Sequence, residues 1–201
     1  MADPQLSATR MKLILASASP RRAEILRRAG FSFEVLAADV DESRRPEEPP
    51  DVFVTRLAQD KAAVVAAQVH GAALILGGDT VVLADGLILG KPADAGDAAA
   101  MLRRLSGRTH DVLTGLALLR VPDGVVRVAV ERTRVTFVPL GEEEIAEYVE
   151  IGEPFGKAGA YAIQECGGRF VARIEGEYFN VMGLPVAQFY RMWRELDRAS
   201  G

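Results

Sequence analysis

The sequence predicts an α/β fold built on a mixed β-sheet. Helix-like and strand-like segments alternate over the first half of the chain, which is typical of parallel strands joined by helices. Two long β runs then follow one another across Pro122-Asp123-Gly124, which indicates an antiparallel hairpin. Parallel and antiparallel pairs together require a sheet of mixed direction. The length of 201 residues suits one domain, or one domain with two lobes.

The N-terminal elements follow from short apolar runs and their end signals. Ser19 and Pro20 read as the N-cap and first residue of a helix, because proline is preorganised for that position. Charge and proline between two periodic segments favour an exposed loop. The predicted elements are a strand over 11–16, a helix over 20–30, a strand over 31–36, an exposed loop over 39–50 and a helix from its cap Asp51 to about Val69.

The remaining elements are read in the same way. Gly77-Gly78 predicts a break in a central strand, and Asp85-Gly86 predicts a tight hairpin turn. Three glutamates at the start of one segment suit a helix N-terminus. The predicted elements are strands over 74–83 and 87–90, a helix over 94–105, β runs over 111–121 and 125–138, a helix over 141–149, strands over 158–164 and 169–174, and a helix over 184–196.

Bulk composition restricts the classes of partner. The net charge of −4 argues against broad binding to a nucleic-acid backbone, and no apolar run is long enough to span a membrane. Residues 1–10 lack the apolar core of a signal peptide and predict a frayed leader, so we expect a cytoplasmic protein. The single cysteine, Cys166, excludes an internal disulfide and fits a reducing compartment.

The segment from Ser17 to Arg22 indicates an anion site. Arg21 and Arg22 fall in the first turn of a predicted helix, where the macrodipole is already positive. A bound phosphate would offset this excess of positive charge, because free backbone N–H groups, a serine hydroxyl and two guanidinium groups would converge on it. The alternative is an ordinary capped helix with two solvated arginines.

Two carboxylates stand out. Asp79 follows two glycines inside an apolar strand, where a carboxylate is costly to bury unless it is paired or coordinated. The alternative is an aspartate that caps a strand end. Glu42 lies in an acidic loop that by itself reads as solvated. Together, Glu42 and Asp79 match the one or two carboxylates that hold Mg²⁺ against substrate phosphates.

Several further polar residues are candidates for ligand contacts. Lys61 lies in mid-helix, where lysine ordinarily snorkels to solvent, and Lys91 ends a strand, a common place for a ligand contact. Gln164 offers both a donor and an acceptor to a base edge. Arg108 or His110 would either contact a ligand or hold a loop.

Taken together, these segments closely resemble the Maf family of nucleoside triphosphate pyrophosphatases over about residues 12–196. The resemblance implies a two-lobed α/β fold with an elongated mixed sheet and a central cleft, so that 11–201 form a single catalytic domain, usually in a homodimer. It also implies that a nucleoside triphosphate is cleaved between its α- and β-phosphates, giving the monophosphate and pyrophosphate, with a divalent metal, Mg²⁺ or Mn²⁺. The matching segments, in family order, are 17–22, 39–42, Arg56-Leu57-Ala58 with Lys61-Ala62, Asp79-Thr80, 90–92, Gly107-Arg108 with His110, 159–164 and 180–185.

The resemblance also assigns roles. Asp79 becomes the proton acceptor and, with Glu42, a metal ligand. The branch that acts on dTTP and UTP carries Thr and Gln at two positions where the 7-methyl-GTP branch tends to carry Gln and Glu. In this chain those positions are Thr80 and Gln164, which favours the dTTP/UTP branch. Two residues depart from the family pattern, Gly78 before Asp79 and Glu165 after Gln164. The residues implied in substrate binding are Ser17, Arg21, Arg22, Lys61, Thr80, Lys91 and Gln164.

Two other functions compete with this interpretation. One is a nucleotide-binding regulator of cell division with little catalysis, although the intact set of charged residues argues against an inactive site. The other is a nucleic-acid-binding protein, suggested by the pairs Arg27-Arg28, Arg44-Arg45 and Arg103-Arg104. Solvated helix faces and loops explain those pairs equally well.

Overall fold

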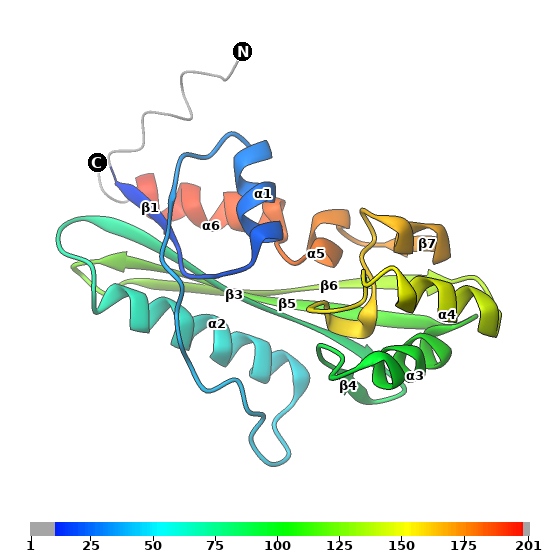
Figure 1. Ribbon diagram of the computed structural model, residues 1–201. Helices are drawn as coiled ribbons and strands as arrows, with labels where there is room; N and C mark the ends of the chain where they lie inside the picture. The colour runs from blue at the N-terminus through cyan, green and yellow to red at the C-terminus, as the bar shows by residue number, and fades with distance from the viewer. Residues whose placement is uncertain (1–10, 199–201) are drawn as a thin grey trace. The chain divides into compact units, whose positions relative to one another are not determined.

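A seven-stranded mixed sheet organises the computed structural model, which describes residues 11–198 (Figure 1). The strand order is β2-β1-β3-β5-β6-β7, and β4 pairs with β3. β1 is parallel to β2 and β3, whereas β3–β4 and β6–β7 are antiparallel. The strands are β1 Lys12–Leu15, β2 Glu34–Val35, β3 Ala73–Ala84, β4 Leu87–Leu89, β5 Thr109–Val121, β6 Val126–Phe137 and β7 Val171–Glu175. The predicted mixed α/β fold is confirmed.

Helices flank this sheet. They are α1 Pro20–Arg28, α2 Pro50–Ala66, α3 Ala95–Leu105, α4 Glu142–Glu150, α5 Tyr178–Met182 and α6 Val186–Arg198, with the 3₁₀ helices η1 Ala158–Ala160 and η2 Cys166–Phe170. Within residues 11–198, none of these helices has the length and apolar character needed to cross a membrane. The predicted leader, 1–10, lies outside the described residues.

The chain divides into two compact units. Within the described residues, the first unit contains 11–79, Thr114–Glu131 and 183–198, and the second contains Thr80–Leu113 and Arg132–Met182. β3, β5 and β6 therefore each have residues in both units. That 11–201 act as one catalytic domain stays a prediction.

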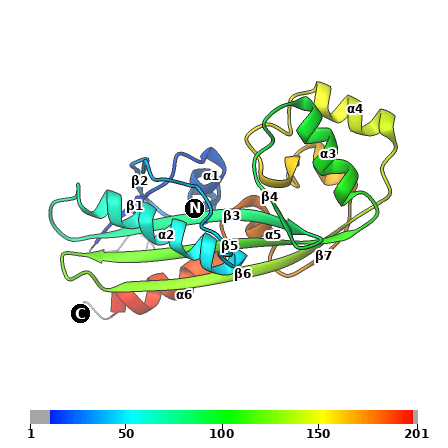
Figure 2. The same ribbon diagram turned by 90° about the horizontal axis from the view of Figure 1, so that it is seen from below.

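In the first unit, helices cover both faces of the sheet. α1 and α6 lie on one face and α2 on the other (Figures 1 and 2). Phe31, just after α1, packs edge-on against Phe189 of α6 at a centroid distance of 4.9 Å and against Trp193 at 5.5 Å. On the α2 side, the core consists of small and branched side chains: Ile14, Ala16, Ala58, Ala62, Val65, Ala73, Ile75 and Ala117.

Two glycines allow α2 to approach the sheet closely. A Cβ atom added at Gly77 of β3 would lie 2.0 Å from the carbonyl oxygen of Ala58. One added at Gly115 of β5 would lie 2.3 Å from the carbonyl oxygen of Val54. No side chain fits against backbone at such distances, so glycine is required at both positions. The predicted break at Gly77-Gly78 is wrong, because β3 runs through both glycines and uses the first for helix packing.

The second unit is built around aromatic rings. Phe137 packs edge-on against Tyr161 at a centroid distance of 4.8 Å and against His110 at 5.0 Å, and Tyr148 packs against Phe170 at 4.9 Å. α3 and α4 lie side by side in this unit (Figures 1 and 2).

Three predicted local features differ from the structure. Asp51 does not cap α2: the helix starts at Pro50, so Asp51 lies in its first turn. The N-cap residue is Pro49, whose side chain has no acceptor for a cap bond. The strand predicted over 31–36 shortens to β2, Glu34–Val35. The short helix α5 was not predicted, since five residues show too little periodicity.

The strand predicted over 158–164 is also wrong. Gly159 and Ala160 have φ values of 71° and 59°, which are left-handed and incompatible with a strand. The segment forms η1 and a turn instead, and its apolar side chains are buried by packing rather than in a β ladder. The second predicted strand of this region, 169–174, is β7, Val171–Glu175, preceded by η2.

His110 is part of the aromatic core rather than an exposed ligand contact. Its ring is 3% exposed, and its Nε2 lies 3.0 Å from the Tyr161 hydroxyl. Its buried Nδ1 meets no hydrogen-bond partner among residues 11–198. Burial disfavours the charged imidazolium and lowers the pKa of His110 to about 4. The neutral ring is therefore the folded form near neutral pH.

We predict that substituting Gly77 with alanine destabilises the fold, whereas substituting its neighbour does not. The alanine methyl of Gly77→Ala would displace α2, at a cost of about 3 kcal/mol in the free energy of unfolding. In Gly78→Ala the new Cβ would meet Leu116 at 3.4 Å, an ordinary contact, so we expect a change within about 0.5 kcal/mol. Urea denaturation of both variants provides the measurement. Equal stabilities would contradict the proposed close approach.

We predict that His110 makes folding stability depend on pH between about 6.5 and about 4. Its pKa in the folded protein is depressed, so over this window the unfolded chain binds a proton that the folded protein does not. Stability is complete above the window and falls as the pH is lowered, by on the order of 3 kcal/mol at pH 4. Urea titrations of wild type and His110→Gln, at several pH values, isolate this contribution. A difference between the two proteins that is constant with pH would refute it.

Candidate active site

Lys61 lies between two carboxylates in the first unit. Its Nζ donates to Asp79 Oδ1 at 2.7 Å and lies 2.7 Å from Glu42 Oε1. The side chains of Lys61 and Asp79 are only 8% and 14% exposed, whereas that of Glu42 is 51% exposed. The ammonium group is thus buried on one side and open to solvent on the Glu42 side. Lys61 therefore does not snorkel to solvent, and Asp79 does not cap a strand end, which were the alternatives for these two residues.

The packing of α2 on β3 explains this arrangement. The Cα–Cβ direction at Gly77 points at α2, and side chains alternate along a strand, so Asp79 projects toward the same helix. Lys61 follows Ala58, whose carbonyl lies over Gly77, by one turn of α2. The close approach at Gly77 therefore brings the lysine to the aspartate. Gly78, one residue earlier, faces Leu116 and Arg22 instead.

The serine- and arginine-rich segment before α1 forms a tight polar cluster. Ser19 caps the helix as predicted, its Oγ accepting from the Arg22 backbone N–H at 3.4 Å. Ser17 Oγ accepts from the Ser19 N–H at 3.2 Å and from Arg22 Nη1 at 3.0 Å. Arg22 Nε donates to the carbonyl of Gly183 at 2.8 Å. Arg22 is therefore a buried cation with a fixed orientation, and not the solvated arginine of the alternative interpretation.

The charges of these two groups influence one another. Burial lowers the pKa of Arg22 below its usual value, and the negative charges of Asp79 and Glu42 oppose that shift. The guanidinium remains charged at any physiological pH. Two buried cations, Arg22 and Lys61, thus accompany two carboxylates in the first unit, with Arg21 half-buried at the start of α1.

Glu42 and Asp79 fit the donor set of a divalent cation. Both carboxylate oxygens lie 2.7 Å from one ammonium nitrogen, so they are separated by no more than twice that distance. A positively charged group is already accommodated between them. Magnesium usually takes one or two protein carboxylates and completes its shell with water and substrate phosphates. Residues 11–198 contain no cluster of three or more His, Cys, Asp or Glu side chains suited to a metal.

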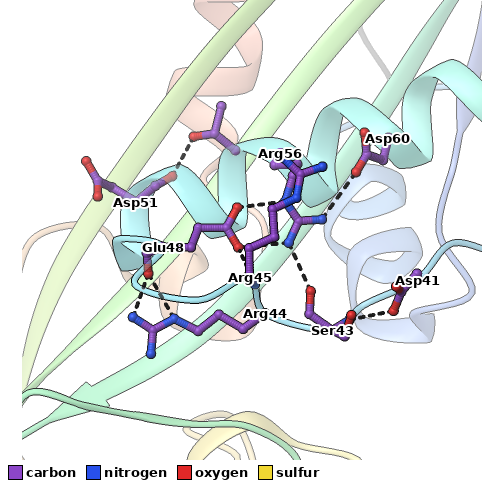
Figure 3. A network of polar contacts seen from close by, with 9 residues as sticks. Asp41, Ser43, Arg44, Arg45, Glu48, Asp51, Arg56 and Asp60 are labelled. Atoms are coloured by element: carbon purple, nitrogen blue, oxygen red, sulfur yellow. Dashed lines mark hydrogen bonds and ion pairs between the residues drawn. The ribbon is translucent and has the colours of Figure 1, made fainter.

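A second ion pair fixes the loop that carries Glu42. Glu48 accepts from Arg56 Nε at 2.7 Å and from Arg56 Nη2 at 2.9 Å, in a two-pronged contact (Figure 3). The hydrogen bonds from Arg56 lower the pKa of Glu48 to about 2, and Glu48 raises the pKa of Arg56. Sequence reasoning assigned no role to either residue. The signals in the sequence were the segment Arg56-Leu57-Ala58, one of those that resemble the family pattern, and the charge of Arg56 five positions before Lys61 in a predicted helix.

The other predicted site residues belong to the second unit. Thr80 follows Asp79 in β3 and is half-buried, and Lys91 is exposed after β4. Gln164 is half-buried, and its Nε2 donates to Glu165 Oε1 at 3.1 Å. Arg108, the other candidate beside His110, pairs with Asp85 at 2.8 Å on the surface. The structure thus groups Ser17, Arg22, Glu42, Lys61 and Asp79 in one unit, and places Thr80, Lys91 and Gln164 in the other.

Comparison with known proteins gives consistent matches over most of the chain. The family described as Maf-like protein matches residues 12–196. The dTTP/UTP pyrophosphatase of Koribacter versatilis is 52% identical over 184 residues, covering 92% of this chain and 94% of that protein. The enzyme of the same name from Symbiobacterium thermophilum is 50% identical over 181 residues, covering 90% and 92%. That from Syntrophus aciditrophicus is 47% identical over 185 residues, covering 92% and 90%.

Among solved structures, the nucleoside-triphosphatase (dITP/XTP pyrophosphatase) of Mycobacterium abscessus aligns with a TM-score of 0.39 at 17% identity. The alignment covers 63% of this chain and 73% of that one. This likeness is too distant to bear on the site. The family match and the identities near 50% are decisive without it: the chain belongs to the Maf family.

Proposed function

We propose that this protein hydrolyses dTTP and UTP to the nucleoside monophosphate and pyrophosphate, with a divalent cation, Mg²⁺ or Mn²⁺. The observation that carries the proposal is the convergence of Asp79 and Glu42 on Lys61, in the unit that also holds buried Arg22. It agrees with the name shared by the relatives from Koribacter, Symbiobacterium and Syntrophus.

Asp79 acts as the proton acceptor in this proposal. Its carboxylate is held by Lys61 but remains partly exposed, so water reaches it. The water oxygen forms a bond to the α-phosphorus as its proton passes to Asp79. The bond from the α-phosphorus to the oxygen bridging to the β-phosphate breaks, and pyrophosphate leaves with that oxygen.

Cations of the chain bind the phosphates. Arg22 and Lys61 are already oriented by their neighbours, so little reorganisation is needed when negative charge develops on the phosphoryl oxygens. Ser17 and the N-terminus of α1 bind one phosphate, assisted by Arg21. Glu42 and Asp79 would hold the divalent cation, which when bound neutralises phosphate charge and polarises the phosphoryl group. Lys91 is assigned to the phosphates from the family resemblance.

The base preference is assigned to Thr80 and Gln164, also from the resemblance. Gln164 Nε2 donates a hydrogen bond to Glu165, which leaves the amide oxygen of Gln164 to accept one from the base. This supports a contact in which the base is the donor. Thymine and uracil both offer an N3–H donor, and cytosine has no hydrogen there. Glu165, the departure from the family pattern, thereby favours thymine and uracil over cytosine. The homodimer and the cytoplasmic location remain part of this proposal.

The test is pyrophosphate release from a panel of dTTP, UTP, CTP, 7-methyl-GTP and the common purine triphosphates, each with Mg²⁺ or Mn²⁺. We expect selective turnover of dTTP and UTP and poor turnover of CTP. Preferred turnover of 7-methyl-GTP would keep the reaction and overturn the base assignment. Binding without turnover of any nucleotide would favour the cell-division regulator instead.

We predict that Asp79→Asn lowers kcat by at least about 100-fold, because general-base assistance contributes about 10²–10⁴-fold. The amide keeps the size of the side chain, so without a divalent metal dTTP should still bind within a few-fold of wild type, as measured by equilibrium dialysis. Asp85→Asn is the matched control, since Asp85 pairs with Arg108 on a surface hairpin. Near-normal turnover of Asp79→Asn would remove Asp79 from its assigned role.

A further inference from the structure

The loop that carries Glu42 has little of its own to hold it in place. Residues 36–44 have no helix or strand, and from 41 to 49 every side chain except that of Glu48 is exposed. Glu42 pairs with Lys61, but its side chain is half-exposed, and one contact at the end of a side chain does not fix the backbone that carries it. The contacts of the neighbouring loop residues therefore also bear on the position of this carboxylate.

Arg56 and Glu48 provide these contacts. Their side chains are only 13% and 5% exposed. The guanidinium of Arg56 binds both carboxylate oxygens of Glu48, and its Nη2 also donates to the carbonyl of Ser43 at 3.0 Å (Figure 3). Ser43 directly follows Glu42. Arg56 thus binds the loop at the residue next to the carboxylate.

Glu48 extends the network through the rest of the loop. Its Oε2 accepts from the backbone N–H of Arg45 at 3.1 Å, and its own carbonyl accepts from Arg44 Nε at 2.9 Å. The Ser43 N–H donates to Asp41 Oδ1 at 2.9 Å, which fixes the turn around Glu42. The backbone is therefore tied to one buried ion pair at Ser43 and Arg45, and the Arg44 side chain adds a bond to the backbone of Glu48 itself.

Both anchors of the loop come from one helix. Arg56 and Lys61 lie on α2, and Lys61 also binds Asp79. The helix consequently fixes the backbone beside Glu42 through Arg56, and fixes the carboxylates of Glu42 and Asp79 through Lys61. The distance between those two carboxylates depends on both connections.

We propose that Arg56 and Glu48 are positioning residues for the candidate metal site, holding Glu42 in register with Asp79. This proposal rests on the function proposed above for its metal. Without the pair, Glu42 faces Asp79 only part of the time. The apparent metal affinity falls in proportion to that fraction, while the chemistry at saturating metal is retained.

The first arm of the test measures the loop without nucleotide or metal. Arg56→Lys keeps the charge but loses the two-pronged contact, and Glu48→Gln keeps the shape but loses the charge. We expect at least 10-fold faster amide hydrogen exchange of Ser43 and Arg45 in both variants. The same substitutions in the exposed pair of Arg103 and Glu142, Arg103→Lys and Glu142→Gln, are the matched controls. They should leave the loop amides unchanged.

The second arm measures Mn²⁺ binding, from the electron paramagnetic resonance signal of free Mn²⁺ with a non-hydrolysable α,β-methylene analogue of dTTP. We expect the Kd for Mn²⁺ to rise at least 10-fold in Arg56→Lys and Glu48→Gln, and the double variant to be no worse than the poorer single one. Turnover of dTTP at saturating Mn²⁺ should stay within about threefold of wild type, and the controls should match wild type.

Several results would overturn the proposal. An unchanged Kd for Mn²⁺ in folded variants would show that the pair only stabilises the fold. Loss of kcat without a change in Kd, or exchange that rises equally throughout the protein, would do the same. Failure of wild type to bind Mn²⁺ would overturn the positioning role whatever its turnover. Conversely, Mn²⁺ binding that depends on the pair, in a protein that hydrolyses no nucleotide, would overturn the proposed function alone.

Discussion

The close approach of α2 to the sheet is the constraint on which the candidate site depends. At Gly77 and Gly115 the helix backbone occupies the space of a missing side chain. That proximity lets a lysine on the helix reach an aspartate on the strand at 2.7 Å while both are largely removed from water. A buried lysine is costly when unpaired, and breaking such a pair commonly costs about 3–5 kcal/mol. The packing of α2 on the sheet, the Lys61–Asp79 pair and the geometry of the candidate site therefore depend on one another.

Two cations with fixed orientations prepare the first unit for a polyanion. Arg22 is fixed by Ser17 and by the carbonyl of Gly183, and Lys61 is fixed by two carboxylates. Charges held in advance of the substrate need not reorganise during the reaction, which is the main source of electrostatic catalysis. The carboxylates keep these cations from being buried without partners, and they also form the donor set for a cation of higher charge. One set of contacts thus serves the stability of the free protein and its proposed chemistry.

Local sequence patterns predicted most of the helices and strands. They failed where long-range contacts determine the local structure. Ser19 and Pro20 mark the start of α1 because the cap is a local interaction, and Asp85-Gly86 marks its hairpin for the same reason. The apolar run 158–164 looks like a strand, but its burial comes from packing in the aromatic core, which periodicity does not reveal. Asp79 was a candidate in the sequence because its carboxylate lies inside an apolar strand, and Lys61 because it lies in mid-helix. Their pairing over 18 positions required the fold.

Glu48 shows why composition alone misjudges a functional loop. Its neighbours in the sequence are charged and exposed, and nothing local distinguishes it from Glu47. Glu48 differs from its neighbours in being buried. The guanidinium of Arg56 binds both carboxylate oxygens of Glu48 and the backbone carbonyl of Ser43 at once. An apolar pair of similar volume could stabilise the loop equally well, since buried ion pairs are seldom the most stable solution. It would not, however, fix the direction of the chain beside Glu42. The geometry of the hydrogen bonds, rather than their net energy, is what this loop gains from the ion pair.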